Sequence, residues 1–195
     1  MPGNTMLRSR YLAIGFMMLV TAWTLVAQTN KTANPPASTF RVVLNSGNTN
    51  VFVQRSGASA WDPAYDGQLL KAGDRIQTRA NTRIVLLGPD GATLRVGEFS
   101  DLEIQSEPES KSGLSLMAYR ARLYFFHRGN PTDLKLRTRT AAAAVRGTEF
   151  NFQTDESGVA QIAVTDGSVA LSNESGAVLL HNGELAARQK TLIPD

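Results

Sequence analysis

One stretch of the chain carries basic and aromatic side chains at a spacing that could recognise a ligand. It is the segment 119–128, YRARLYFFHR. In an extended chain, five of its residues share one face: Arg120, Arg122, Tyr124, Phe126 and Arg128. Arginines interleaved with aromatic rings can form a platform that stacks on rings and binds anionic groups.

A second stretch, Trp61–Tyr65 (WDPAY), predicts a turn that carries two aromatic side chains. Trp61 and Tyr65 could stack on a sugar ring or anchor a partner protein. The alternative is that Trp61 closes the end of a β core.

The basic stretch also has an intramolecular interpretation. Seven basic residues and one acidic residue lie from Arg120 to Arg146, whereas acidic residues gather upstream and downstream of them. Neighbouring strands of opposite charge would pair across a sheet, for about a few tenths of a kcal/mol per pair. Intramolecular pairing and an anionic glycan or protein partner therefore both stay open.

Enzyme chemistry, metals and cofactors are not expected. The chain has no cysteine and two histidines, His127 and His181, which excludes disulfides, thiolate metal sites and multi-histidine sites. The sequence contains no Gly-x-Ser-x-Gly nucleophile motif, no phosphate-binding glycine loop and no EF-hand loop. We expect no catalytic residue, no metal ligand and no cofactor.

The N-terminus has the organisation of an export signal. Arg8 and Arg10 precede an uncharged run from Leu12 to Ala27, which is short for a bilayer span of roughly 20 residues. Residues 1–27 are predicted to be a signal peptide or an uncleaved anchor.

Residues 28–39 follow as a polar, proline-containing linker. The remainder of the chain is expected to leave the cytoplasm for the periplasm or cell envelope. It would touch a membrane only through the N-terminal segment, and only if that segment stays uncleaved.

The charge of the exported part argues against nucleic acid as a partner. Without Arg8 and Arg10, the net charge of the chain falls from +3 to +1. A nearly neutral chain has little electrostatic reason to bind DNA or an anionic membrane.

The remainder, residues 40–193, has the pattern of one all-β domain. Glycines recur at intervals of about ten residues, and apolar and polar side chains alternate between them, which is the period-two signal of half-buried strands. Asp90-Gly91 and Asp166-Gly167 predict β-hairpins, because glycine accepts the positive φ of a tight turn. At Ala141–Ala144 a short helix is the alternative to a strand. We expect short, mostly antiparallel strands in two facing sheets or a solenoid-like β roll, preceded by an apolar signal helix.

Several segments, in order, resemble the FecR domain. The less specific ones are 70–78 (LKAGDRIQT), 83–91 (RIVLLGPDG), 94–96 (LRV) and 100–104 (SDLEI). More specific are 144–150 (AVRGTEF), similar to the family's Val-x-Gly-Thr-x-Phe core, 162–169 (IAVTDGSV), similar to its strand–Gly–Val hairpin, and 182–184 (NGE). Together they run from about Val42 to Ala187.

The resemblance implies an all-β module of the bacterial periplasm that works through contacts with other proteins. The namesake passes a signal from an outer-membrane receptor to a sigma factor. It also carries a cytoplasmic anti-sigma segment and a receptor-contacting domain. We expect both to be lacking here, since about ten residues precede the apolar run and the sequence ends at Asp195.

The signature residues are interpreted as structural. The glycines suit turns that need a positive φ, and Asp74 can accept backbone hydrogen bonds beside such a turn. Phe150 is expected in the core. The set is Gly73, Asp74, Gly91, Gly147, Thr148, Phe150 and Gly167.

The sequence thus predicts a non-enzymatic periplasmic interaction or signalling module whose partner is another envelope protein or an envelope glycan. The alternative is a glycan-binding or structural protein of the cell envelope. The candidate binding residues are Trp61, Tyr65, Arg120, Arg122, Tyr124 and Arg128.

Overall fold

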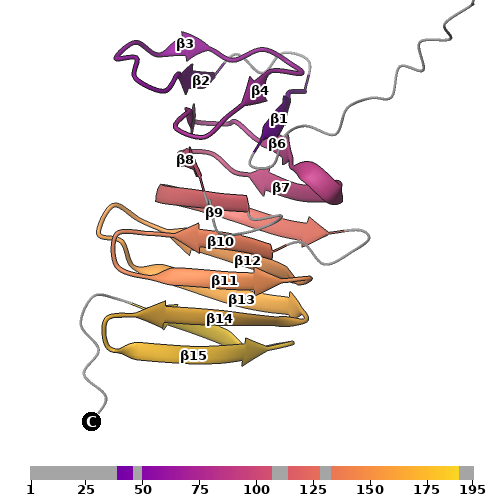
Figure 1. Ribbon diagram of the computed structural model, residues 1–195, viewed down its shortest axis with the longest axis vertical. Coiled ribbons are helices and arrows are strands. Elements are labelled where there is room, and N and C mark those ends of the chain that lie inside the picture. The colour runs from indigo at the N-terminus through magenta and orange to yellow at the C-terminus, as the bar shows by residue number, and fades with distance from the viewer. Residues whose placement is uncertain (1–38, 46–49, 107–113, 128–132, 189–195) are drawn as a thin grey trace, which may run out of the picture. The chain divides into compact units, whose positions relative to one another are not determined.

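The computed structural model describes residues 39–45, 50–106, 114–127 and 133–188 (Figure 1). These residues belong to one compact unit, Asn34–Asp195. In the described ranges, its elements are strands and one 3-10 turn, η1 (Pro89–Gly91). Within the described ranges no helix is long and apolar enough to span a bilayer. The predicted signal segment lies outside those ranges.

Sixteen strands form one connected sheet with two branches. Branch A has the order β4 (Leu69–Leu70), β1 (Phe40–Val43), β6 (Ile84–Leu87), β7 (Ala92–Val96), β9 (Leu114–His127), β12 (Glu149–Thr154), β13 (Ala160–Asp166) and β16 (Leu185–Arg188). Branch B has the order β3 (Asp62–Pro63), β2 (Val51–Gln54), β5 (Arg75–Thr78), β8 (Asp101–Gln105), β9, β10 (Asp133–Arg137), β11 (Ala142–Arg146), β14 (Ser168–Asn173) and β15 (Gly176–His181). Figure 1 shows β10, β11, β14 and β15 in one layer, with β12 and β13 behind them.

The long strand β9 belongs to both branches. Its first half pairs with β8 and β10, and its second half pairs with β7 and β12. Between the halves the register shifts: Ala118 lies opposite Leu102 and Arg120 lies opposite Asp101, which leaves Tyr119 as an extra residue. Such a bulge changes the phase of the alternation, and strands that pass from one sheet to another use this device.

The apolar side chains of both branches form one core cluster, which explains why the branches face each other. The predicted alternation is confirmed, because the apolar member of each run is buried. These residues are Leu94, Val96, Leu102, Ile104, Leu134, Leu136, Phe150, Phe152, Ile162, Val164, Val169 and Leu171. Burial of these faces is the main force that holds the strands in this register.

The all-β, mostly antiparallel prediction is confirmed, with one parallel pair, β9 and β10. The strands form a single mixed sheet whose two branches share β9, where the sequence predicts two sheets or a roll. Ala142–Arg146 is strand β11, so the helix alternative is wrong at these residues. The cause is burial of Ala143 and Val145 between β10 and β14.

One of the two predicted hairpins is correct. Strands β6 and β7 flank Asp90-Gly91 and pair from Ile84, opposite Val96, onward. The hairpin at Asp166-Gly167 is wrong: β13 pairs with β12 and β16, whereas β14 pairs with β11 and β15. Gly167 does have a positive φ, +83°, but the turn there is a corner between the two branches.

Candidate functional site

The predicted aromatic turn lies on branch B, where its Ala64 packs against the core cluster. Trp61 is half-buried, and Tyr65 is 62% exposed. The guanidinium carbon of Arg75 lies 5.8 Å from the centroid of a Trp61 ring. Trp61 therefore lies beside a cation and is not part of the core cluster. That it closes the end of the core stays a prediction.

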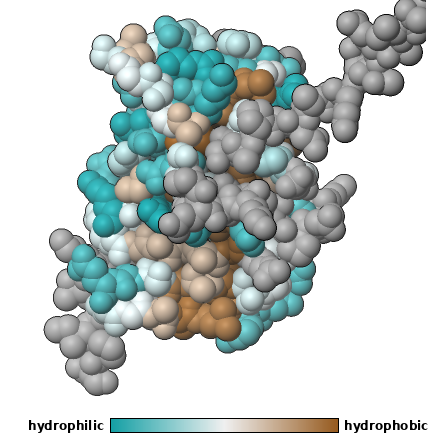
Figure 2. Space-filling view, in the orientation of Figure 1, coloured by the Kyte–Doolittle hydropathy of each residue, from teal (hydrophilic) through white to brown (hydrophobic). Residues whose placement is uncertain are grey.

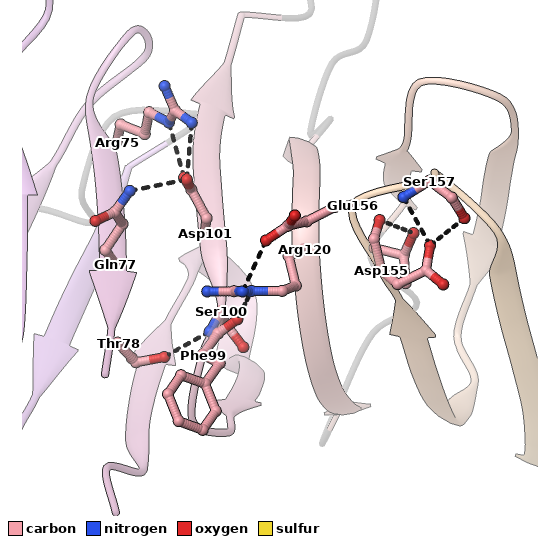
Figure 3. Close-up of polar contacts among 11 residues, drawn as sticks. Arg75, Gln77, Thr78, Phe99, Ser100, Asp101, Arg120, Asp155, Glu156 and Ser157 are labelled. Carbon is pink, nitrogen blue, oxygen red and sulfur yellow. Dashed lines mark hydrogen bonds and ion pairs between the residues drawn. The ribbon is translucent and has the colours of Figure 1, made fainter. Parts of the chain in front are cut away.

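Arg75 organises a polar network beside this turn (Figure 3). Its Nε and Nη2 each donate to a carboxylate oxygen of Asp101 at 2.7 Å, and Gln77 donates to the same carboxylate at 2.9 Å. The hydrogen bonds that Arg75 donates to Asp101 outweigh partial burial and raise the pKa of Arg75. Because the charges in this network compensate each other, its geometry supports a structural role.

Tyr119 continues the network on its other side. The guanidinium carbon of Arg75 lies 4.1 Å from the Tyr119 ring centroid. The Tyr119 hydroxyl donates to Glu103 at 2.8 Å, and this hydrogen bond raises the pKa of Tyr119. The bulge thus turns Tyr119 toward branch B, whereas Arg122 and Tyr124 point outward from branch A.

Arg120, at the bulge, pairs within the chain. It donates to the carbonyl oxygen of Phe99 and forms an ion pair of 2.9 Å with Glu156 (Figure 3). Phe99 itself has φ +54° and is 46% exposed. For Arg120, pairing with one of the downstream acidic residues is what the structure shows.

The outer face of branch A carries a cleft of about 480 Å³, which we call the A-face cleft. A cross-strand row runs through it from Val43 to Leu185 by way of Val85, Arg95, Tyr124, Asn151 and Ala163. Each residue lies opposite the next on the neighbouring strand. The alternation that buries one face of these strands thus aligns these side chains on the other face.

The charge of the A-face cleft is one-sided. Arg83, Arg95 and Arg122 line it with exposed side chains, and none of its described lining residues is acidic. The guanidinium carbon of Arg95 lies 5.8 Å from the Tyr124 ring centroid and 5.1 Å from that of Phe126. Stacking of this kind fixes the plane of a guanidinium group while leaving its charge available.

Amide side chains complete the polar part of the cleft. Asn151, Gln153 and Gln161 line it and can both donate and accept hydrogen bonds. The Tyr124 hydroxyl is held by Glu149, to which it donates at 2.9 Å, and this hydrogen bond raises the pKa of Tyr124. The arrangement can bind an anionic group through arginine and orient it through amides.

A different surface lies at the far end of branch B. Figure 2 shows hydrophobic residues gathered toward β14 and β15. Ala144, Ala170 and Leu179 lie opposite one another across three strands there, and Leu179 is 55% exposed. Branch B thus presents an apolar surface, and branch A presents a basic one.

The structure brings together two of the six predicted binding residues. Arg122 and Tyr124 line the A-face cleft. The other predicted residues lie elsewhere: Trp61 and Tyr65 on branch B, Arg120 in its ion pair with Glu156, and Arg128 outside the described residues. Sequence reasoning missed Arg83, Arg95 and Asn151, although the polar outward positions of β7 and β12 were a signal for the last two.

The signature pair Gly73 and Asp74 joins two turns. The Asp74 carboxylate accepts hydrogen bonds from the backbone amides of Ser56 and Lys71, each at 3.0 Å, and from Arg55 at 2.7 Å. Burial opposes ionisation, but these hydrogen bonds outweigh it and lower the pKa of Asp74. Gly73 has φ +86°, and a Cβ there would lie 2.3 Å from the Ser56 hydroxyl oxygen.

The other signature residues occupy turns, corners and the core. Gly91 and Gly147 have φ of +84° and +59°. Thr148 and Phe150 are buried, and the Phe150 ring centroid lies 5.4 Å from that of Phe125. These positions have the local geometry that the sequence predicts for glycine turns and core side chains.

The fold and the cleft define an all-β domain with a cleft on one sheet face. Within the described ranges, no three histidine, aspartate or glutamate residues gather so as to hold a metal ion. Residues 74–170 match the family model described as FecR protein, and this segment belongs to the FecR family. The match is narrower than the resemblance from Val42 to Ala187 and leaves out 182–184.

Two solved structures are similar to the chain. Both are crystal structures of a candidate anti-sigma factor from Parabacteroides distasonis ATCC 8503, at 2.50 and 1.65 Å resolution. Each is 18% identical and covers 60% of this chain and 59% of that chain, with TM-scores of 0.48 and 0.45. The chain thus spans about 59% of the length of these structures. No curated protein sequence matches it.

Proposed function

We propose that the protein is an exported, non-enzymatic binding module that takes part in signalling at the bacterial envelope by contacting another envelope protein. The A-face cleft carries this proposal, because it offers an accessible surface of cations and amides on a FecR-family scaffold. The signalling role that the resemblance to the FecR family implies supports a regulatory role for this protein.

Export is the second part of the proposal. It is supported by the sequence alone: Arg8 and Arg10 precede the uncharged run from Leu12 to Ala27. The periplasm is the compartment that this signal and the family resemblance favour.

Site-specific crosslinking in living cells tests both parts. A photoreactive amino acid replaces Asn151, which is exposed in the A-face cleft, in the tagged full-length chain. The matched control position is Glu174, which is exposed in the turn between β14 and β15. We expect a defined envelope protein to be captured from position 151 and not from position 174.

Mass spectrometry of the same samples reads the N-terminus. A mature end near Gln28 and release with the periplasmic fraction are expected for a cleaved signal, and an intact N-terminal peptide in the membrane fraction for an anchor. A protein recovered in the cytoplasm, or no protein captured from position 151, would contradict the proposal.

A glycan-binding role is the second candidate, favoured by the exposed ring of Tyr65 beside Trp61. Retention of the purified chain on envelope polysaccharide would be compared with that of Trp61→Ala and Arg122→Ala. Loss of retention in both variants would favour the glycan role. Unchanged retention, which our proposal expects, would count against it.

A further inference from the structure

We propose that the A-face cleft binds an extended acidic peptide segment of the partner protein, with acidic residues in the middle and apolar residues at both ends. The inference rests on the proposed function, and it specifies the chemistry of the ligand.

The two central arginines are placed to act together. Arg95 lies directly opposite Tyr124, and Arg122 precedes Tyr124 by two residues on the same outer face. Diagonal neighbours of this kind have Cβ atoms about 7–8 Å apart or slightly less. Two long guanidinium side chains at that spacing can hold one carboxylate between them, or two carboxylates of adjacent acidic residues.

The charge of these arginines is not compensated as it is elsewhere in the domain. Arg55, Arg75 and Arg120 each form an ion pair with an aspartate or glutamate. Within the described residues, by contrast, no carboxylate forms an ion pair with Arg95 or Arg122. An acidic ligand is the complement of this surface.

The cross-strand row ends in apolar residues on both sides of the cleft, although Asn45, Arg83 and Gln161 also line it there. Val43 and Val85 lie at one end, and Ala163 and Leu185 at the other, with Leu185 73% exposed. The apolar residues at the two ends of the row accept aliphatic side chains. Because Arg95 already stacks on Tyr124, the aromatic ring within the cleft is less available to a sugar. These features favour a peptide over an acidic glycan.

The direction of the row sets the length and the mode of binding. It crosses seven strands, from β1 to β16, which corresponds to about 29 Å at a strand spacing of about 4.8 Å. About nine extended residues span that length. The crossed strands pair with each other through their backbones, so recognition must come from side chains and not from added strand pairing.

Peptide selection on the full-length protein tests the inference. A displayed library of random peptides of about nine residues is selected on the wild-type chain and on the double variant Arg95→Gln/Arg122→Gln. The matched control, Arg139→Gln, changes an exposed arginine that does not line the cleft. We expect wild-type selection to enrich peptides with Asp or Glu at the centre and aliphatic residues at the ends.

Binding of one enriched peptide is then measured by fluorescence anisotropy. We expect the double variant to bind at least about tenfold more weakly, the control to bind like the wild type, and added salt to weaken binding. Circular dichroism and thermal unfolding of each variant show whether it is folded. All three exchanges remove an exposed charge, so we expect both variant proteins to fold.

Four outcomes would overturn the inference: no enrichment, enrichment without acidic residues, equal binding to the double variant, or loss of binding in the control as well. Oligogalacturonate serves as an acidic glycan probe, and binding of it that depends on Arg95 and Arg122 without peptide enrichment would assign the cleft to glycan. If position 151 crosslinks the same partner in the wild type and in the double variant, the inference fails while the proposed function stands.

Discussion

A Cβ atom placed on Gly167 would lie 2.4 Å from Cγ2 of Thr148. Thr148 forms the corner at which the chain passes from β11 in branch B to β12 in branch A, and Gly167 forms the corner at which it returns from β13 to β14. The two corners pack against each other directly. This contact connects the Gly-Thr and Asp-Gly segments that resemble the FecR domain.

Gly167→Ala is expected to lower the free energy of unfolding more than Gly183→Ala. Both glycines have φ +83°, but a Cβ on Gly183 would meet nothing within 4 Å. The backbone strain, about 1 kcal/mol, is therefore common to both variants. Overpacking against Thr148 adds about 1–3 kcal/mol in Gly167→Ala alone. Urea denaturation of both variants measures the difference.

The variant Thr148→Ser tests the cause of that difference, since serine lacks the Cγ2 atom. In the Thr148→Ser background, Gly167→Ala should cost about as much as Gly183→Ala does. A cost that stays as large as in the wild type would show that Thr148 is not the source of the strain.

Thr148→Val is expected to leave the free energy of unfolding unchanged or to raise it by about 1 kcal/mol. The Thr148 hydroxyl is buried and has no hydrogen-bond partner among the described residues, so an isosteric methyl group removes a desolvated polar atom. Thr78→Val is the matched control. Its buried hydroxyl donates to the Gly97 carbonyl at 2.6 Å. It also accepts from the Ser100 amide at 2.9 Å, a hydrogen bond that Figure 3 shows.

The control should cost about 1–3 kcal/mol, because the valine leaves the buried Ser100 amide without this acceptor and removes one of the two side-chain donors to the Gly97 carbonyl. Chemical denaturation of both variants checks the pair. Equal destabilisation by the two substitutions would mean that the Thr148 hydroxyl does form a hydrogen bond in solution.

Asp74→Asn is expected to lower the free energy of unfolding at pH 7 by about 1.5–3 kcal/mol. The amide would turn one acceptor into a donor where Ser56, Lys71 and Arg55 all donate. Asp62→Asn, an exposed exchange on β3, should have little effect and serves as the control.

The effect of Asp74 depends on pH in a definite direction. Its pKa in the folded state lies below the ordinary value of 3.8, so the carboxylate stabilises the fold fully above that value. This contribution is lost as the pH falls through the lowered pKa. The difference between wild type and Asp74→Asn should therefore shrink below pH 3.8, and a difference that grows with acid would contradict the assignment.

Glu103→Gln is expected to move the pKa of Tyr119 back toward its ordinary value. The hydrogen bond to the Glu103 carboxylate raises that pKa by opposing formation of a phenolate. Since the raised pKa stabilises the fold below the ordinary value of 10.0, this stability is lost as the pH rises through the raised one. Spectrophotometric titration at alkaline pH measures the shift. The variant Glu149→Gln removes the carboxylate that raises the pKa of Tyr124, and it thereby identifies the signal of that second tyrosine. An unchanged titration curve in Glu103→Gln would refute the role of this hydrogen bond.

The strands could be predicted because burial imposes a period of two on the sequence. Leu94 and Val96 indicate which face of their strand is buried, as do Phe150 and Phe152, and this does not depend on which strands they pair with. Partner choice is different. Asp90-Gly91 and Asp166-Gly167 have the same turn chemistry, yet only the first joins paired strands, because packing across the core decides where β13 and β14 go.

The site was less accessible to prediction for two physical reasons. The bulge at Tyr119 depends on the register of β8 against β9, and no local signal in the segment 119–128 reveals it. The A-face cleft combines side chains of strands far apart in the sequence, so that Arg95 and Asn151 meet Tyr124 only after folding. Arg122 and Tyr124 could be found because they alternate within one strand.

Strand β9 makes the domain a single folding unit. Before β9 is synthesised, β7 and β8 each end a growing branch with an unpaired edge, and β9 covers both edges. Residues 40–105 therefore cannot complete the strand pairing of either branch by themselves, and β10 and β12 within residues 133–188 lack the neighbouring strand that β9 supplies. We expect one unfolding transition for both branches, and an early stage in synthesis at which two open strand edges are exposed to other chains.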